Sequence, residues 1–222
     1  TKDDLRTYPG SDPGRVDYKL VTNWKVPLLE KAAQNFLLAA SKTERKDFNN
    51  FCNDNSKWLN DFTLFVAIKE HYDVKAEKEN SPDSRWNYYW DRNIILKQKS
   101  AELEWIQKYK EQIEIKKVLQ YFFFKQWASV KKYANSKGIS IIGDIPIYVA
   151  ACSSDLWSNR RMFHVDEDGH QTVGAGVPPD YFSRTGQLWG NPIYKWEEHE
   201  AEGFSWWISR IQGTLKLVDI VR

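Results

Sequence analysis

Hydrophobic residues recur at helical spacing through much of the first 137 residues. Three segments, residues 27–40, 57–72 and 100–137, place an apolar side chain at every third or fourth position, which is typical of helices that bury one face. Asn23 is the expected N-cap of the first helix, since its side chain can accept from the free N–H groups of the first turn. The polar residues 73–85 predict a surface loop between the second helix and the third.

The pattern changes after Gly138 to short runs of β-branched residues. Residues 139–142 form one such run, and residues 217–221 form a second run after an amphipathic helix at 204–215. A helix followed by an apolar β-branched run is an α/β unit, and parallel strands in such units are covered on both faces. The sequence therefore predicts an α/β fold with two buried strands, and the chain is expected to end on a core strand.

The segment between these two strands has little periodicity. Residues 163–173 place two short strand-like runs around Asp166-Glu167-Asp168-Gly169, which predicts a hairpin. Residues 174–192 are rich in glycine, proline and aromatic residues, and we expect a long, ordered loop there. Two hypotheses stay open for this loop: a lid that exposes its rings to a ligand, or an Ω-loop that packs its own rings.

Composition narrows the class of ligand. The net charge of the 222 residues is only +2, which gives no electrostatic basis for binding nucleic acid or an anionic membrane and favours an uncharged ligand. Aromatic residues make up 15% of the chain, enough both for core packing and for platforms on which sugar rings stack. No apolar run reaches the roughly 20 residues of a membrane helix. With two separated cysteines and no apolar leader at the start, we expect a cytoplasmic protein.

Two charged residues follow the predicted strands, and they are the candidates for chemistry. Asp144 comes after the first strand and Arg222 after the last. In α/β barrels the active site forms at this end of the strands, because the strand–helix loops converge there. The alternatives are that Asp144 caps a turn and that Arg222 is an ordinary exposed arginine. The histidines and cysteines lack metal-ligand spacing and residues 166–169 lack calcium-loop spacing, so we expect neither a metal nor a cofactor.

Several sequence strings have a counterpart in a known family. The matching residues are Lys137-Gly138-Ile139, Gly143-Asp144-Ile145-Pro146-Ile147-Tyr148-Val149-Ala150, Ser153, Asp155, Trp157, residues 175–183 and 185–187, and Trp189-Gly190-Asn191-Pro192. From about Val16 onward, the chain resembles the amylomaltase (4-α-glucanotransferase) family of the α-amylase clan. The resemblance implies part of a (β/α)₈ TIM barrel with large helical insertions. Residues 1–137 would hold the N-terminal helical insertion and first barrel elements, and residues 138–222 the barrel strands with the aromatic lid loop at 174–192.

The resemblance also implies an activity and a site. Members transfer α-1,4-glucan segments between glucans by a retaining double displacement, without a cofactor, and their partners are maltooligosaccharides and starch or glycogen fragments. Arg222 would keep the nucleophilic carboxylate ionised and touch the sugar, and Asp144 would bind the same sugar or orient Arg222. The substrate-binding lid residues would be Asp180, Tyr181, Phe182, Trp189 and Asn191.

Two features of the sequence bear on this implied function. The nucleophilic Asp of the family comes two residues after an arginine of the Arg222 type, and its acid/base Glu comes later, so these 222 residues by themselves are expected to be inactive. Ala151 and Cys152 stand where the family usually has an aromatic residue and an Asp. The alternatives to a transferase are a non-catalytic glucan-binding module and a glucan hydrolase of the same clan.

Overall fold

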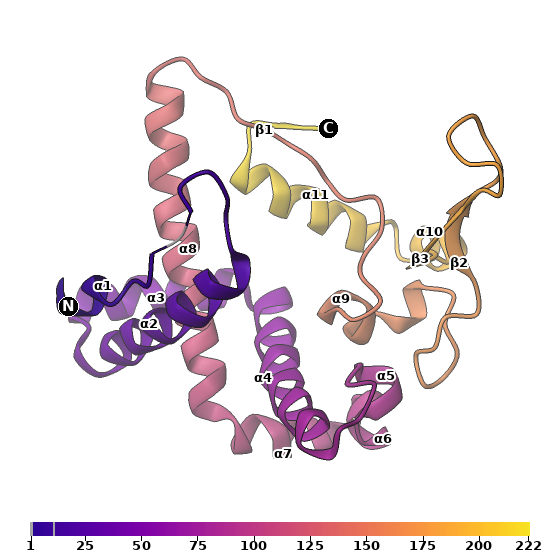
Figure 1. Ribbon diagram of the computed structural model, residues 1–222, viewed down its shortest axis with the longest axis horizontal. Coiled ribbons are helices and arrows are strands. Elements are labelled where there is room, and N and C mark those ends of the chain that lie inside the picture. The colour runs from indigo at the N-terminus through magenta and orange to yellow at the C-terminus, as the bar shows by residue number, and fades with distance from the viewer. Residues whose placement is uncertain (1, 11) are drawn as a thin grey trace.

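The computed structural model describes residues 2–10 and 12–222, and helices make up most of it (Figure 1). The helices are α1 (Lys2–Arg6), α2 (Tyr18–Ala39), α3 (Lys42–Asp54), α4 (Ser56–Glu79), α5 (Trp86–Tyr89), α6 (Arg92–Ile95), α7 (Lys99–Lys108), α8 (Lys110–Ser136), α9 (Ser154–Ser158), the 3₁₀ turn η1 (Arg160–Met162), α10 (Trp196–Ala201) and α11 (Ser205–Leu217). The strands are β1 (Ile142–Gly143), β2 (Gly174–Val177), β3 (Gln187–Pro192) and β4 (Ile220–Val221). In this described part, no helix combines the length and the apolarity that crossing a membrane requires.

The long helix α8 organises the helical part, with α2 and α3 packed on one side and α4 on another (Figure 1). A small apolar cluster fills the space between α2, α3 and α8, and its buried members are Ala33, Phe48, Ile115, Val118 and Tyr121. A larger cluster continues from α4 through the short helices to α9 and includes the fully buried Trp86, Trp157 and Phe163. The core therefore joins the helical part to the segment that carries the strands.

Helix ends differ from the sequence expectation where a better cap is present. The Asp17 side chain accepts from the Leu20 N–H at 3.0 Å and starts α2 at Tyr18, so the cap predicted at Asn23 is wrong and Asn23 lies inside the helix. The loop predicted at residues 73–85 is also wrong over its first half, because α4 continues to Glu79 and ends at Asn80 in the left-handed conformation.

Strands β1 and β4 pair in parallel, with Ile142 opposite Ile220 and Gly143 opposite Val221. The two runs thus form strands, but the prediction that both are buried is wrong: Ile142 is 64% exposed and Ile220 is 50% exposed. Among the described residues, each strand pairs only with the other, so the outer edge of each strand is unpaired, and Ile142 and Ile220, which lie opposite each other, face solvent. The absence of a side chain at Gly143 allows β1 to lie close to the Val218 side chain, since a Cβ at this position would lie 2.6 Å from Val218 Cγ1.

Asp219 links the strand pair to α8 through its carboxylate. It accepts from the Ile141 N–H at 2.8 Å and from Asn135 Nδ2 at 2.8 Å, and it lies 3.3 Å from Lys131 Nζ. The Ile141 N–H lowers the pKa of this carboxyl, and Asn135 and Lys131 lower it further. Because the pKa of Asp219 is lower in the folded state than in the unfolded state, its ionised carboxylate stabilises the fold at any pH above the unfolded-state pKa. This stabilisation is lost as the pH falls through the pKa of the folded state.

We therefore expect Asp219→Asn to lower the melting temperature at neutral pH and to have less effect as the pH falls below about 4. Thermal unfolding of both proteins from pH 7 to pH 3, followed by circular dichroism, measures this. A difference in melting temperature that stays constant over the whole range would contradict the assignment.

Residues 174–192 are not a loop throughout, which corrects the sequence expectation. Strands β2 and β3 form an antiparallel hairpin in which Gly176 lies opposite Leu188 and Val177 opposite Gln187. Only the tip at residues 178–186 lacks regular structure. A Cβ on Gly176 would lie 2.6 Å from the Gln187 carbonyl oxygen, so the absence of a side chain allows the two strands to approach. The hairpin extends away from the remaining elements (Figure 1).

Candidate functional site

The parallel register of β1 and β4 brings Asp144 and Arg222 together. Each residue directly follows its strand, and Arg222 Nε and Nη2 donate to Asp144 Oδ1 and Oδ2 at 2.9 and 3.1 Å. Main-chain bonds extend the pairing beyond both strands, since the Arg222 N–H donates to the Gly143 carbonyl oxygen at 2.9 Å and the Ile145 N–H donates to the Arg222 carbonyl oxygen at 3.1 Å. This fork-to-fork geometry fixes both charged groups at the carboxyl ends of the strands.

The Asp144–Arg222 pair faces solvent. The side chains are 65% and 81% exposed, so the pair contributes at most about 1 kcal/mol to folding. Of the two alternatives, the first is wrong, because the Asp144 side chain binds an arginine rather than capping a turn. The second holds for exposure, since Arg222 faces solvent, but its guanidinium is bound to Asp144. A charged pair that is ordered, exposed and of little value to stability is able to meet a ligand.

The base of the β2–β3 hairpin contacts the segment that follows Asp144. The Tyr148 and Trp189 ring centroids are 6.3 Å apart, edge to face, and Asn191 Nδ2 donates to the Val149 carbonyl oxygen at 3.2 Å. Two of the predicted lid residues, Trp189 and Asn191, thus lie beside the strand–loop segment that carries Asp144. Their contacts attach the hairpin to the site.

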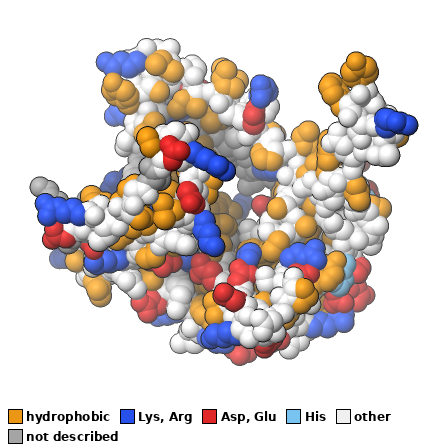
Figure 2. All heavy atoms as spheres, in the orientation of Figure 1, with side chains coloured by type: hydrophobic (Ala, Val, Ile, Leu, Met, Phe, Trp, Pro, Cys, Tyr) orange, Lys and Arg blue, Asp and Glu red, His pale blue; other side chains and the backbone are white. Residues whose placement is uncertain are grey.

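The tip of the hairpin carries the other three predicted lid residues. Asp180 Oδ1 accepts from the N–H groups of Phe182 at 2.9 Å and Ser183 at 2.8 Å, which folds the tip into a tight turn. The turn projects Tyr181 and Phe182, which are 98% and 89% exposed. Hydrophobic side chains gather at this outer end of the hairpin (Figure 2). An Ω-loop that buries its own rings is therefore wrong, and the Asp180 carboxylate is engaged in shaping the tip.

The residues that depart from the family pattern face the helical core. The Ala151 carbonyl oxygen accepts from Trp86 Nε1 at 2.9 Å, and Cys152 packs half-buried against the large apolar cluster. Trp157, part of the same matching string, is fully buried and donates from Nε1 to the Ile94 carbonyl oxygen at 3.0 Å. These positions connect the site-bearing segment to α4–α6.

Two side chains that the sequence analysis did not single out also reach the segment after Asp144. The Tyr194 hydroxyl donates to the Ile147 carbonyl oxygen at 2.8 Å, and Arg210 Nη2 donates to the Pro146 carbonyl oxygen at 2.5 Å. A usable signal was present, since Arg210 stands three residues after Trp207, beside the apolar stripe of a helix. Such a position commonly holds an arginine that stacks on its neighbour.

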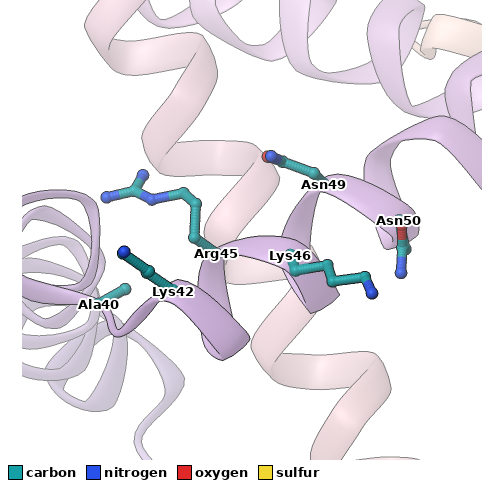
Figure 3. A pocket seen from close by; sticks show the side chains of 6 residues that line it. All are labelled: Ala40, Lys42, Arg45, Lys46, Asn49 and Asn50. Atoms are coloured by element: carbon teal, nitrogen blue, oxygen red, sulfur yellow. The ribbon is translucent and has the colours of Figure 1, made fainter.

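Two hollows elsewhere on the surface differ in character from the Asp144–Arg222 pair. The first, of about 510 Å³, lies along α3 and is lined by Ala40, Lys42, Arg45, Lys46, Asn49 and Asn50 (Figure 3). Its lining offers cations and amides but no aromatic ring on which a sugar could stack. The second, of about 500 Å³, lies between α4 and the start of α8, where His71 Nδ1 and the Tyr109 hydroxyl share a hydrogen bond of 2.6 Å. Burial lowers the pKa of His71, which favours a neutral ring there.

Fold and site together define the class: an α/β protein whose charged site lies at the carboxyl ends of adjacent parallel strands, where α/β enzymes bind their ligands. Residues 1–222 match the family model described as 4-alpha-glucanotransferase, and the chain belongs to that family. It is 44% identical over 217 residues to the 4-alpha-glucanotransferase of Streptococcus pneumoniae, covering 96% of this chain and 40% of that protein. With the Aquifex aeolicus 4-alpha-glucanotransferase the identity is 42% over 219 residues, covering 99% and 41%.

A solved structure of the family has the same fold as this chain. It is the amylomaltase from Streptococcus agalactiae in complex with acarbose, which superposes with a TM-score of 0.89 at 42% identity. The match covers 100% of this chain and 43% of that one. The chain thus spans about two fifths of the length of these relatives.

Proposed function

We propose that this chain supplies sugar-binding residues to a 4-α-glucanotransferase, which moves α-1,4-glucan segments from one glucan to another by a retaining double displacement. The observation that carries the proposal is the bidentate contact of Asp144 and Arg222 at the strand ends, in a chain 42% identical to an amylomaltase solved with acarbose. A retaining mechanism needs a carboxylate nucleophile and a carboxylic acid about 5 Å apart. A fixed guanidinium beside such a nucleophile keeps it ionised, because an opposite charge favours the charged form.

In this proposal each site residue has a role. Arg222 stabilises the ionised nucleophile and contacts the sugar at the point of cleavage, and Asp144 orients Arg222 or binds the same sugar. Asp180 shapes the lid, and its exposed rings Tyr181 and Phe182 stack on the acceptor glucan, with Trp189 and Asn191 at the base. A lid with apolar rings favours a sugar over water as the second acceptor.

The barrel is part of the same proposal. Residues 1–137 supply the helical insertion and the first barrel elements, and residues 138–222 supply barrel strands and the lid. The parallel β1–β4 pair, with α11 preceding β4, supports this division because barrel strands are parallel and alternate with helices. A cytoplasmic location belongs to the proposal as well, and two free thiols, Cys52 and Cys152, support it.

The experiment is a chimera in which these 222 residues replace the matching 43% of the Streptococcus agalactiae amylomaltase. Incubated with maltotriose, the chimera should produce glucose together with longer maltooligosaccharides. Glucose without longer products would instead indicate a hydrolase, and glucan binding without either product would indicate a binding module. The 222 residues alone serve as the control and should release no glucose, because the family's nucleophile and acid/base are assigned to none of them.

The lid predicts a binding defect without a folding defect. Replacing Tyr181 and Phe182 together with alanine in the chimera should raise the KM for the acceptor glucan roughly tenfold, since each stacked ring contributes about 0.5–1.5 kcal/mol. The free energy of unfolding of the variant chain, measured in urea, should change by less than about 0.5 kcal/mol, because both side chains are exposed. Tyr88→Ala, at an aromatic residue 55% exposed on another element, is the matched control and should leave the KM unchanged. Equal KM values in all three proteins would contradict the lid.

A further inference from the structure

Two tryptophan rings hold Arg210 in one orientation. Its guanidinium carbon lies 5.3 Å from the Trp206 ring centroid and 5.1 Å from the Trp207 ring centroid, within the range of a cation–π contact. Both rings and the arginine belong to α11, so their spacing is set by the helix. A planar guanidinium held in this way presents its N–H groups in a fixed direction.

From this position Arg210 donates to two acceptors on other segments. Nη2 donates to the Pro146 carbonyl oxygen at 2.5 Å, and Nη1 donates to the Tyr194 hydroxyl oxygen at 2.8 Å. The hydroxyl in turn donates to the Ile147 carbonyl oxygen at 2.8 Å. Burial raises the pKa of Tyr194 while Arg210 opposes the rise, so the phenol keeps its proton at neutral pH and remains a donor.

The backbone that receives these bonds has no regular structure of its own. Residues 145–149 lie outside any helix or strand, and after the bond from the Ile145 N–H to the Arg222 carbonyl oxygen no main-chain ladder fixes the path of residues 146–149. Side chains bind it instead, with Arg210, Tyr194 and Asn191 donating to its carbonyl oxygens. The segment begins immediately after Asp144, and the bidentate pair with Arg222 tolerates little movement of that carboxylate.

We propose that Arg210, acting directly on Pro146 and through Tyr194 on Ile147, is a positioning residue for the Asp144–Arg222 pair. It fixes the direction in which the chain leaves β1 and thereby the orientation of the Asp144 carboxylate. The role of the Asp144–Arg222 pair in binding a sugar rests on the proposed function. The geometry of the pair is independent of that function. Loss of the anchor removes the side-chain bonds to Pro146 and Ile147, and the carboxylate no longer meets both nitrogen atoms of Arg222 at once.

The test is the ¹⁵N–¹H signal of the Arg222 Nε–H group in the 222-residue chain, recorded at mildly acidic pH and low temperature without ligand. In the parent, the bond to Asp144 slows exchange with solvent and yields a resolved signal. Arg210→Gln should broaden this signal to loss, and Arg210→Lys, which keeps the charge but offers one donor nitrogen in place of two, should restore part of it. Arg161→Gln is the matched control, because it removes an exposed arginine that lies 3.6 Å from Glu202, and it should leave the signal intact.

A purely structural role for Arg210 would lower the unfolding midpoint and leave the Arg222 signal of the folded molecules unchanged, and that result would overturn the proposal. Should Arg210→Gln fail to fold, Tyr194→Phe keeps the ring and removes only the hydroxyl, which is both the donor to Ile147 and the acceptor of Arg210 Nη1, and it should weaken the same signal. Titration with acarbose provides a separate readout. A parent chain that does not bind acarbose counts against the proposed function, while the ligand-free signal still decides the role of Arg210.

Discussion

Replacing Trp157 with alanine should lower the free energy of unfolding by about 3–5 kcal/mol, as for other large-to-small substitutions of buried aromatic residues. Trp157 is fully buried, with its ring 5.8 Å from that of Phe65 and 6.2 Å from that of Trp90, and Lys97 Nζ lies 4.7 Å from its ring centroid. The truncation leaves a cavity between α4, α6 and α9. It also removes the bond from Nε1 to the Ile94 carbonyl oxygen, which keeps only its main-chain donors such as the Lys97 N–H at 3.1 Å.

Urea unfolding followed by circular dichroism measures this effect, with the slope of the transition checked for a change in the denatured state. Tyr181→Ala is the matched control, since it removes a large aromatic side chain that is 98% exposed, and it should stay within about 0.5 kcal/mol of the parent. A loss below about 1 kcal/mol for Trp157→Ala would mean that the cluster joining the helical part to the strand segment is not packed as described.

Asp144→Asn in the amylomaltase chimera should reduce the transfer rate on the order of 100-fold while changing stability by less than about 1 kcal/mol. The amide keeps the size of the carboxylate but turns one acceptor toward Arg222 into a donor, so the two-point contact is lost. In the proposed mechanism Arg222 then loses its fixed place beside the nucleophile. A small displacement of a charged group at a reacting centre is enough for a loss of this size.

Asp83→Asn is the matched control for Asp144→Asn. Asp83 also forms a bidentate pair, with Arg85 Nε at 3.0 Å and Nη2 at 2.5 Å, but on the connection between α4 and α5. Initial rates of glucose release from maltotriose and urea unfolding should therefore separate the two variants: both fold normally, and only Asp144→Asn loses activity. An Asp144→Asn enzyme with the parental rate would remove the Asp144–Arg222 pair from the proposed mechanism.

The residue pattern predicts helices over 27–40, 57–72 and 100–137, which correspond to α2, α4 and α7 with α8, and it identifies the change of structure near Gly138. The pattern also predicts that Asp144 and Arg222 follow the two strands, because a β-branched run between helices can be identified from neighbouring residues alone. The irregular strings around residues 175–192 pointed to the family, which the match over residues 1–222 confirms. The roles of the lid residues and of the domain boundary at 137 stay predictions.

The residue pattern predicts the structure less well where the same local sequence is compatible with two structures. Glycine, proline and aromatic residues at 174–192 predicted a loop, but the close approach that Gly176 permits allows β2 and β3 to pair. Trp157 is one of the residues that match the family, and the sequence does not indicate whether its ring lies in the core or at the functional site. In the structure the ring is fully buried in the core. The expected burial of Ile142 and Ile220 was wrong, because burial depends on the neighbours that the described residues provide.

The sequence by itself determined the three main helical segments, the two β-branched runs that become β1 and β4, and the charged residues that follow these runs, because these properties depend on residues within one or two turns of each other. The family resemblance left open whether Asp144 orients Arg222 or binds a sugar, and only the tertiary structure decided that Arg222 donates to Asp144, 78 positions earlier. It also decided that Arg210 and Tyr194 hold the backbone at Pro146 and Ile147. The physical reason is that strand register and side-chain contacts between distant segments are set by how the whole core packs, and periodicity along the chain carries no record of that packing.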